Sequence, residues 1–253
     1  MYLEEPMDKS EFPEAIASLV DTLASLPHVV AVTLAGSQAL VREHADVDWD
    51  LGVYYCGEFD PKGLAHFEGA VAAPGDWGRI MNGGARLIVD GLMVDVFYRD
   101  IDEVRHWVRE AEAGRFEVDR LPGFLAGIPT YALAAERALG TVVAGSLEGA
   151  VDYPDRLAEE GAARWRDHAR FSLERAGLQA ARGDVAGVLG HLARAGAEVA
   201  HARLCEARQW TVNEKEILER AELTHLNQIL TVLHTDPVTL TQRVMQARTL
   251  LLD

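Results

Sequence analysis

The chain has 253 residues, a formal net charge of -16 and 49% apolar residues. Its length predicts one large or two modest domains, and its composition is that of an ordinary globular protein. The acidic balance argues against nucleic acid as a partner, because phosphate backbones require a basic surface. No apolar run approaches the ~20 residues that cross a bilayer, and the acidic first residues lack a signal pattern. We therefore expect a cytoplasmic protein with no membrane partner.

The first predicted elements are a helix over residues 14–26 and a strand over residues 28–36. The helix carries apolar residues at helical spacing and ends at Pro27. The strand is rich in β-branched residues and leads to Gly36 and Ser37. Gly36 permits close approach of a backbone, and Ser37 adds amide and hydroxyl donors, so this turn suits phosphate oxygens.

Two acids, Asp48 and Asp50, stand at the start of the next predicted strand, residues 49–57. Side chains two residues apart project from the same face of a strand. Two carboxylates about 4 Å apart repel by roughly 4 kcal/mol at an effective dielectric of about 20, which a raised pKa or a hard cation such as Mg²⁺ would offset. Asp46 and Asp48 form an alternative pair. We prefer Asp48 and Asp50 because apolar residues then alternate onward from Asp50.

A third acid follows in a predicted hairpin over residues 85–100, after a short helix over residues 61–73 and a turn-rich loop. Asp90-Gly91 is a strong two-residue turn signal. Asp95 stands in the middle of the apolar second run, VDVFY. A buried carboxylate there is costly unless it is paired, hydrogen-bonded or bound to metal. We interpret Asp95 as the third acid of the site; an edge-strand residue facing water is the alternative.

An amphipathic helix is predicted over residues 101–114, an irregular segment after it, and a further helix over residues 130–140. Glu136 in that helix is interpreted either as a helix-surface acid paired with a neighbouring arginine or as an acceptor-side general base with a raised pKa. Residues 142–157 have the composition of a linker, which places the domain boundary near residue 152.

The chain is thus expected to form two domains, 1–152 and 153–253, of the α+β class. The first would be a mixed sheet flanked by helices and the second an all-helical bundle. Short connections predict four antiparallel helices, over residues 157–181, 184–208, 213–233 and 239–252. Cys56 and Cys205 lack a CxxC partner and are expected to be reduced and buried.

The pattern Gly36-Ser37, a spacer, and Asp48-x-Asp50 leading into an apolar strand resembles the signature of the DNA polymerase beta-like nucleotidyltransferase superfamily. The nearest resemblance is to small bacterial antibiotic nucleotidyltransferases of the aminoglycoside and lincosamide type. It covers about the first 100 residues, and Val47 stands where the family commonly has serine. It implies a nucleotidyltransferase fold for the first domain and acceptor binding by the second.

The resemblance also implies roles for single residues. Ser37 would contact nucleotide phosphate, two Mg²⁺ ions would be held by Asp48 and Asp50, and Asp95 would complete the site as a metal ligand or as the base that takes the acceptor proton. Lys215 matches a lysine that family members place near the nucleotide phosphates; a solvated first-turn lysine is the alternative.

Arg42 precedes the Asp pair in the predicted loop. It either reaches a triphosphate or is a surface arginine without a special role.

The expected activity is Mg²⁺-dependent transfer of a nucleoside monophosphate, AMP from ATP, to a hydroxyl of a small molecule such as an antibiotic, with release of pyrophosphate. Residues 1–150 hold 25 acids and 11 bases, which favours a cationic acceptor. Two alternatives are an antitoxin-type adenylyltransferase that modifies a partner toxin, and a regulator that binds Mg²⁺ and nucleotide without turnover.

Overall fold

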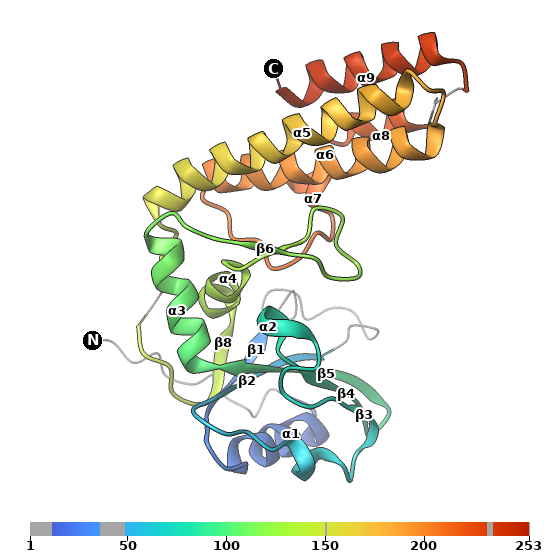
Figure 1. The fold of residues 1–253 in the computed structure, drawn as a ribbon. Coiled ribbons are helices and arrows are strands. Elements are labelled where there is room, and N and C mark those ends of the chain that lie inside the picture. Colours follow the sequence, from blue (N-terminus) through green and yellow to red (C-terminus); the bar gives the residue numbers. More distant parts are fainter. Residues whose placement is uncertain (1–11, 36–48, 150, 232–234, 253) are drawn as a thin grey trace. The chain divides into compact units, whose positions relative to one another are not determined.

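The computed structural model describes residues 12–35, 49–149, 151–231 and 235–252 (Figure 1). The chain forms two compact units, Met1–Val108 with Leu133–Asp152, and Arg109–Ala132 with Tyr153–Asp253. The expected boundary near residue 152 coincides with one passage of the chain between these units. Residues 109–132, which the sequence placed in the first domain, group with the second unit.

The first unit is an α+β fold on a mixed sheet, as expected, and its described residues supply six strands in the order β3-β4-β5-β2-β1-β8. The parallel pair is β2 with β5, and the other described neighbours are antiparallel. The strands are β1 (Val29–Ala35), β2 (Trp49–Tyr55), β3 (Glu68–Val71), β4 (Gly84–Val89), β5 (Leu92–Asp100) and β8 (Thr141–Gly145). The accompanying helices are α1 (Glu14–Ser25), η3 (Pro61–Leu64), α2 (Gly78–Met81), α3 (Ile101–Glu112) and α4 (Ala132–Leu139).

Helix α1 covers one face of the sheet (Figure 1). Its apolar residues recur at the i, i+3, i+4, i+7 spacing that makes one buried stripe. The strands oppose this stripe with alternate apolar residues, each of which contributes about 1.5–3 kcal/mol when fully buried. The main members of this core are Ile16, Leu19, Val20, Leu23, Leu51, Val53, Val94 and Val96.

The opposite face of the sheet carries the polar residues of β2 and β5. Neighbouring residues of a strand point to opposite faces, so Asp50 and Tyr54 lie on the face away from α1, and so do Asp95 and Arg99. Helix α4 packs here, because its Glu136 forms an ion pair with Arg99. The sheet is thus flanked by helices on both faces, with Asp50 and Asp95 on the α4 face.

Two segments of the first unit differ from the prediction. Residues 61–73 form the 3-10 helix η3 and the edge strand β3, not one helix. Gly69 has φ +138°, which is not a helical value, and a Cβ there would lie 2.1 Å from the Arg86 carbonyl oxygen. The absence of a side chain at Gly69 therefore lets this stretch pair closely with β4 as a strand. The expected linker instead begins with β8, whose Val142 and Val143 are buried against the sheet.

The second unit is mainly helical and contains α5 (Ala162–Ala180), α6 (Val185–Glu206), α7 (Ile217–Arg220), α8 (His225–Leu230) and α9 (Pro237–Leu252). A π-helical turn, η4 (Leu157–Gly161), precedes α5, and the short strands β6 (Val118–Asp119) and β7 (Ile128–Pro129) pair with each other. Helix α6 begins at the predicted break, where Asp184 Oδ1 accepts a hydrogen bond from Gly187 N at 3.0 Å. Helix α9 packs against both α5 and α6 (Figure 1).

The prediction of the third helix of the bundle is wrong. In place of one helix over residues 213–233, the chain forms the two short helices α7 and α8. Glu216 and Glu222 have φ of 55° and 56°, in the left-handed region. A left-handed residue cannot continue a right-handed helix, so the helical pattern of the sequence is interrupted twice.

The two cysteines are free thiols in different surroundings. Cys205 is buried in α6 as expected, and burial raises its pKa. Cys56, just after β2, is exposed, so the expectation of burial is wrong there. Within the described ranges, no helix combines the length and the apolar character that a membrane span requires.

Candidate active site

One row of residues crosses the sheet at the level of Asp50. Backbone pairing connects, in strand order, Ala70 of β3, Arg86 of β4, Asp95 of β5, Asp50 of β2 and Ala35 of β1. Residues paired in this way have neighbouring side chains on one face. The row therefore brings two acids and one base together from three strands.

Asp50 and Asp95 are direct partners in the parallel pair. Neighbouring strands lie about 4.8 Å apart, so the two carboxylates are close enough to share a cation. Asp50 is half-buried, and the Asp95 side chain is 20% exposed. Asp50 and Asp95, the two predicted acids that the structure describes, thus lie next to each other on neighbouring strands.

Arg86 holds the carboxylate of Asp95 with two parallel hydrogen bonds. Its Nε donates to Oδ1 at 2.8 Å, and its Nη2 donates to Oδ2 at 2.8 Å. This fork geometry is the strong form of an arginine–carboxylate contact. The Arg86 side chain is 62% exposed, however, so the pair is open to solvent and adds at most about 1 kcal/mol to stability.

The site residues predicted from sequence do not include Arg86, although the sequence contains a signal for its position. The two-residue turn Asp90-Gly91 makes Val89 and Leu92 the first pair of the hairpin. Counting three residues back along one strand and three forward along the other pairs Arg86 with Asp95.

The carboxylates of Asp50 and Asp95 suit a hard divalent cation. Mg²⁺ prefers carboxylate oxygens, and neighbouring acids need positive charge, because they repel by roughly 4 kcal/mol at 4 Å and a dielectric of about 20. Each oxygen of Asp95 keeps lone pairs beyond those that Arg86 uses. A metal-binding group of three or more His, Cys, Asp or Glu residues is absent from the described residues. Asp48, the other acid of the predicted set, lies outside them.

Four predicted site residues lie outside the described residues, namely Gly36, Ser37, Arg42 and Asp48. In the sequence, Gly36 directly follows Ala35, the residue that pairs with Asp50. Asp48 stands two positions before Asp50. The described row therefore ends where the predicted phosphate turn begins, and the roles of these four residues stay predictions.

A second polar cluster lies further along the same face. Arg99 is 2% exposed and donates to Glu136 from Nε at 2.5 Å and from Nη2 at 2.8 Å. Its Nη1 donates to the carbonyl oxygens of Met81 and Tyr98 at 2.9 and 2.8 Å. Burial lowers the pKa of Arg99 but Glu136 raises it, and the net shift is upward. Glu136 is therefore paired with an arginine, as one of the two interpretations from sequence has it, but this arginine is buried and comes from β5 instead of lying on the helix surface nearby.

Tyr54 belongs to this cluster as a buried phenol. Burial first, and the charge of Glu136 second, raise its pKa. Tyr54 thus stays protonated near neutral pH and has no role as a base.

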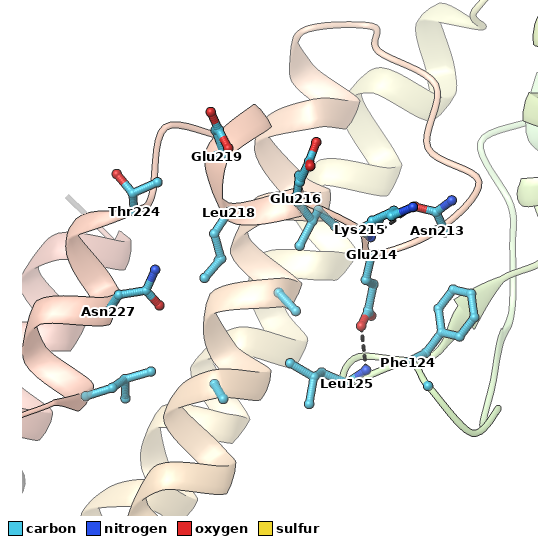
Figure 2. A pocket seen from close by; sticks show the side chains of 15 residues that line it. Phe124, Leu125, Asn213, Glu214, Lys215, Glu216, Leu218, Glu219, Thr224 and Asn227 are labelled. Carbon is cyan, nitrogen blue, oxygen red and sulfur yellow. Dashed lines mark hydrogen bonds between the residues drawn. The ribbon is translucent and has the colours of Figure 1, made fainter. Parts of the chain in front are cut away.

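Lys215 lies in the second unit, on the wall of a pocket of about 800 Å³ (Figure 2). The neighbouring Glu214 fixes this wall, because its carboxylate accepts hydrogen bonds from the backbone amides of Leu125 at 2.5 Å and Ala126 at 2.8 Å. The two bonds join the loop before β7 to the segment before α7. The pocket is therefore bounded by two loops that are tied together.

The charge of this pocket is negative overall. Three glutamates line it, Glu214, Glu216 and Glu219, against the single cation Lys215 among the lining residues that the structure describes. The remaining lining is mostly apolar, with a few amide and hydroxyl groups, and includes Phe124, Leu125, Ala193, Ala197, Leu218, Thr224, Asn227 and Leu230. A pocket of this size and character is typical of small-ligand sites. Its acids make the surroundings of Lys215 less favourable for phosphate than the sequence suggested.

Comparison with known proteins gives structural neighbours alone. No family model and no curated protein matches the sequence. A nucleotidyltransferase-like protein from Exiguobacterium sibiricum has a TM-score of 0.47 and 14% identity, over 94% of this chain and 73% of that chain. An aminoglycoside 6-adenyltransferase from Bacillus subtilis has a TM-score of 0.29 and 10% identity, over 94% of this chain and 89% of that chain. Both neighbours have names of the nucleotidyltransferase kind.

Proposed function

We propose that this protein is a nucleotidyltransferase that transfers a nucleoside monophosphate, AMP from ATP, to a hydroxyl of a small molecule. The observation that carries the proposal is the direct pairing of Asp50 with Asp95 across β2 and β5. The two carboxylates at one register of neighbouring strands offer oxygen ligands of the kind that a divalent cation prefers.

The reaction exchanges a phosphoanhydride bond of ATP for a phosphoester bond to the acceptor. The acceptor oxygen attacks the α-phosphorus of ATP, the bond from that phosphorus to the bridging oxygen breaks, and pyrophosphate leaves with the bonding electrons. Two Mg²⁺ ions would lower the pKa of the acceptor hydroxyl and neutralise the charge of the leaving group. Such transfers need positioning and charge compensation more than covalent help from the protein.

The residues of the chain divide this work. Asp48 and Asp50 are proposed to hold the cations, and Asp95 either completes the ligand set or takes the acceptor proton. Both roles of Asp95 require its carboxylate at the register of Asp50, which the strand pairing supports. Gly36 and Ser37 follow Ala35 at the end of the same row and are proposed to grip the nucleotide phosphates.

The acceptor is proposed to be a small hydroxylated amine, of which the aminoglycosides are one kind. The acidity of residues 1–150 supports a cationic acceptor, and so does the net negative pocket of the second unit. Double replacement of Glu216 and Glu219 by glutamine should raise KM for such an acceptor by about two- to fivefold, as for exposed charges, and leave KM for ATP unchanged. Glu222→Gln, at an exposed position outside the pocket lining, is the matched control.

The experiment that tests the function is a screen of the full chain for pyrophosphate release. It combines Mg²⁺, each of four nucleotides, and a panel of aminoglycosides, lincosamides and other hydroxylated amines. We expect release with at least one pair and its loss in Asp50→Asn. Turnover that persists in Asp50→Asn contradicts the proposal. Calorimetry that shows Mg-ATP binding without pyrophosphate release by any pair would instead identify a nucleotide-binding regulator.

A further inference from the structure

Arg86 occupies a position with two competing demands. Its guanidinium binds both oxygens of Asp95 at 2.8 Å, and Asp95 is the direct neighbour of Asp50. The carboxylate of Asp95 thus binds the guanidinium of Arg86 and is also a candidate ligand for a metal ion from solution. A guanidinium and a divalent cation on one carboxylate repel each other, so each weakens the binding of the other.

The geometry lets Arg86 leave. Its side chain is 62% exposed, whereas that of Asp95 is 20% exposed. An exposed arginine–aspartate pair is held weakly, because solvent and salt screen it. The long arginine side chain can therefore reorient, whereas Asp95 is fixed by its central place in β5.

The chemistry of the guanidinium indicates what it would bind on leaving. Its planar fork matches a phosphate as well as a carboxylate. A nucleotide brings several anionic oxygens to the site at the moment when the cations compensate Asp50 and Asp95. The arginine then gains a partner of higher charge than the one that it gives up.

We propose that Arg86 is a positioning residue that exchanges partners, holding Asp95 in the metal-free chain and binding the nucleotide phosphates when metal and nucleotide enter. This inference rests on the proposed function. It predicts effects of opposite sign on the two ligands: loss of Arg86 tightens the binding of the metal alone and weakens the binding of the nucleotide. A residue that only supports the fold would not separate the two.

The test measures Mn²⁺ binding to the full chain without nucleotide, and ATP binding at saturating Mg²⁺, both by calorimetry. For Arg86→Met, we expect Mn²⁺ affinity to rise by about threefold to fivefold and ATP affinity to fall by a similar factor, the range for one exposed ion pair. Arg86→Lys keeps the charge without the fork, so its Mn²⁺ affinity should lie between those of wild type and Arg86→Met. Unchanged or weaker Mn²⁺ binding by Arg86→Met overturns the inference, and so does unchanged ATP binding.

Two controls separate this inference from the function on which it rests. Arg115 makes a similar two-bond contact with Glu110, with a side chain that is 64% exposed. Arg115→Met removes an exposed ion pair that does not involve Asp50 or Asp95, so it should leave the affinities for Mn²⁺ and for ATP unchanged. Asp50→Asn should lose Mn²⁺ binding. If Asp50→Asn binds Mn²⁺ like wild type, the metal site itself fails; if it loses Mn²⁺ and Arg86→Met shows no change, only the exchange by Arg86 fails.

Discussion

Asp50 and Asp95 come from strands that are not consecutive in the chain, yet they lie directly opposite each other in the parallel pair β2–β5. Parallel neighbours require a crossover between them, and here η3, β3, α2 and β4 form that connection. The chain thus uses a long-range pairing to join two acids.

Asp50→Asn should separate catalysis from folding. The amide keeps the shape of the side chain, so the variant should fold and show a cooperative unfolding transition in EDTA. Turnover should fall by at least about 10²-fold, the scale seen when a group that stabilises the transition state is removed. Thermal unfolding and pyrophosphate release measure the two effects. Asp102→Asn, at an exposed position in the first turn of α3, is the control. An equal loss of activity in this control would contradict a specific role of Asp50 in catalysis.

Glu136→Ala should destabilise the protein strongly. It leaves the guanidinium of Arg99, which is 2% exposed, without its charged partner, and breaking a buried pair in this way costs about 3–5 kcal/mol. Urea unfolding measures the loss. If Glu136→Ala instead keeps the stability of the wild type and lowers only kcat, the acid is an acceptor-side base and the structural interpretation is wrong.

Gly145→Ala should cost more than Gly149→Ala, although the two glycines have nearly the same φ, +71° and +72°. A Cβ at Gly145 would lie 2.1 Å from the Val30 carbonyl oxygen of β1, whereas a Cβ at Gly149 meets nothing within 4 Å. The backbone strain of about 1–3 kcal/mol is common to both, and only Gly145→Ala adds a backbone clash that moves β8. Equal unfolding free energies for the two variants would contradict this prediction, because they would mean that β8 can shift away from Val30 without loss of stability.

His168 should make the second unit less stable in mild acid. Burial lowers its pKa from the ordinary value of 6.5, with Glu198 acting in the opposite direction. The folded chain then binds a proton less readily than the unfolded chain, so stability is complete above pH 6.5 and is lost as the pH falls through the folded pKa. His168→Gln should flatten the fall of the unfolding temperature in this range. An unchanged pH profile would mean that His168 does not contribute.

The sequence predicted most of the first unit because its signals are local. The i, i+3, i+4 spacing in α1 and the alternation in β2 each indicate a buried face, and Asp90-Gly91 fixes the β4–β5 hairpin. Those signals do not state which strands become neighbours. The pairing of Asp50 with Asp95 came from family resemblance and not from periodicity.

The parts that could not be predicted depend on long-range packing or on single dihedral angles. Strand β8 is short and lies in a segment rich in turn residues, so only its pairing with β1 reveals it. The left-handed conformations of Glu216 and Glu222 interrupt the predicted third helix, and neither residue type signals that conformation. The buried pair of Arg99 with Glu136 joins a strand to a helix distant in sequence, which no local pattern encodes.

The most direct test of the account is the position of a cation next to β2 and β5. Crystals of the full chain grown with Mn²⁺ and a non-hydrolysable ATP analogue would show the metal by its anomalous scattering. We predict at least one peak at about 2.0–2.1 Å from carboxylate oxygens, the distance for Mg²⁺-like ligation, with Asp50 and Asp95 both contributing. Well-ordered nucleotide with no metal peak at these two residues, or with the peak at another group of acids, would contradict the proposed site.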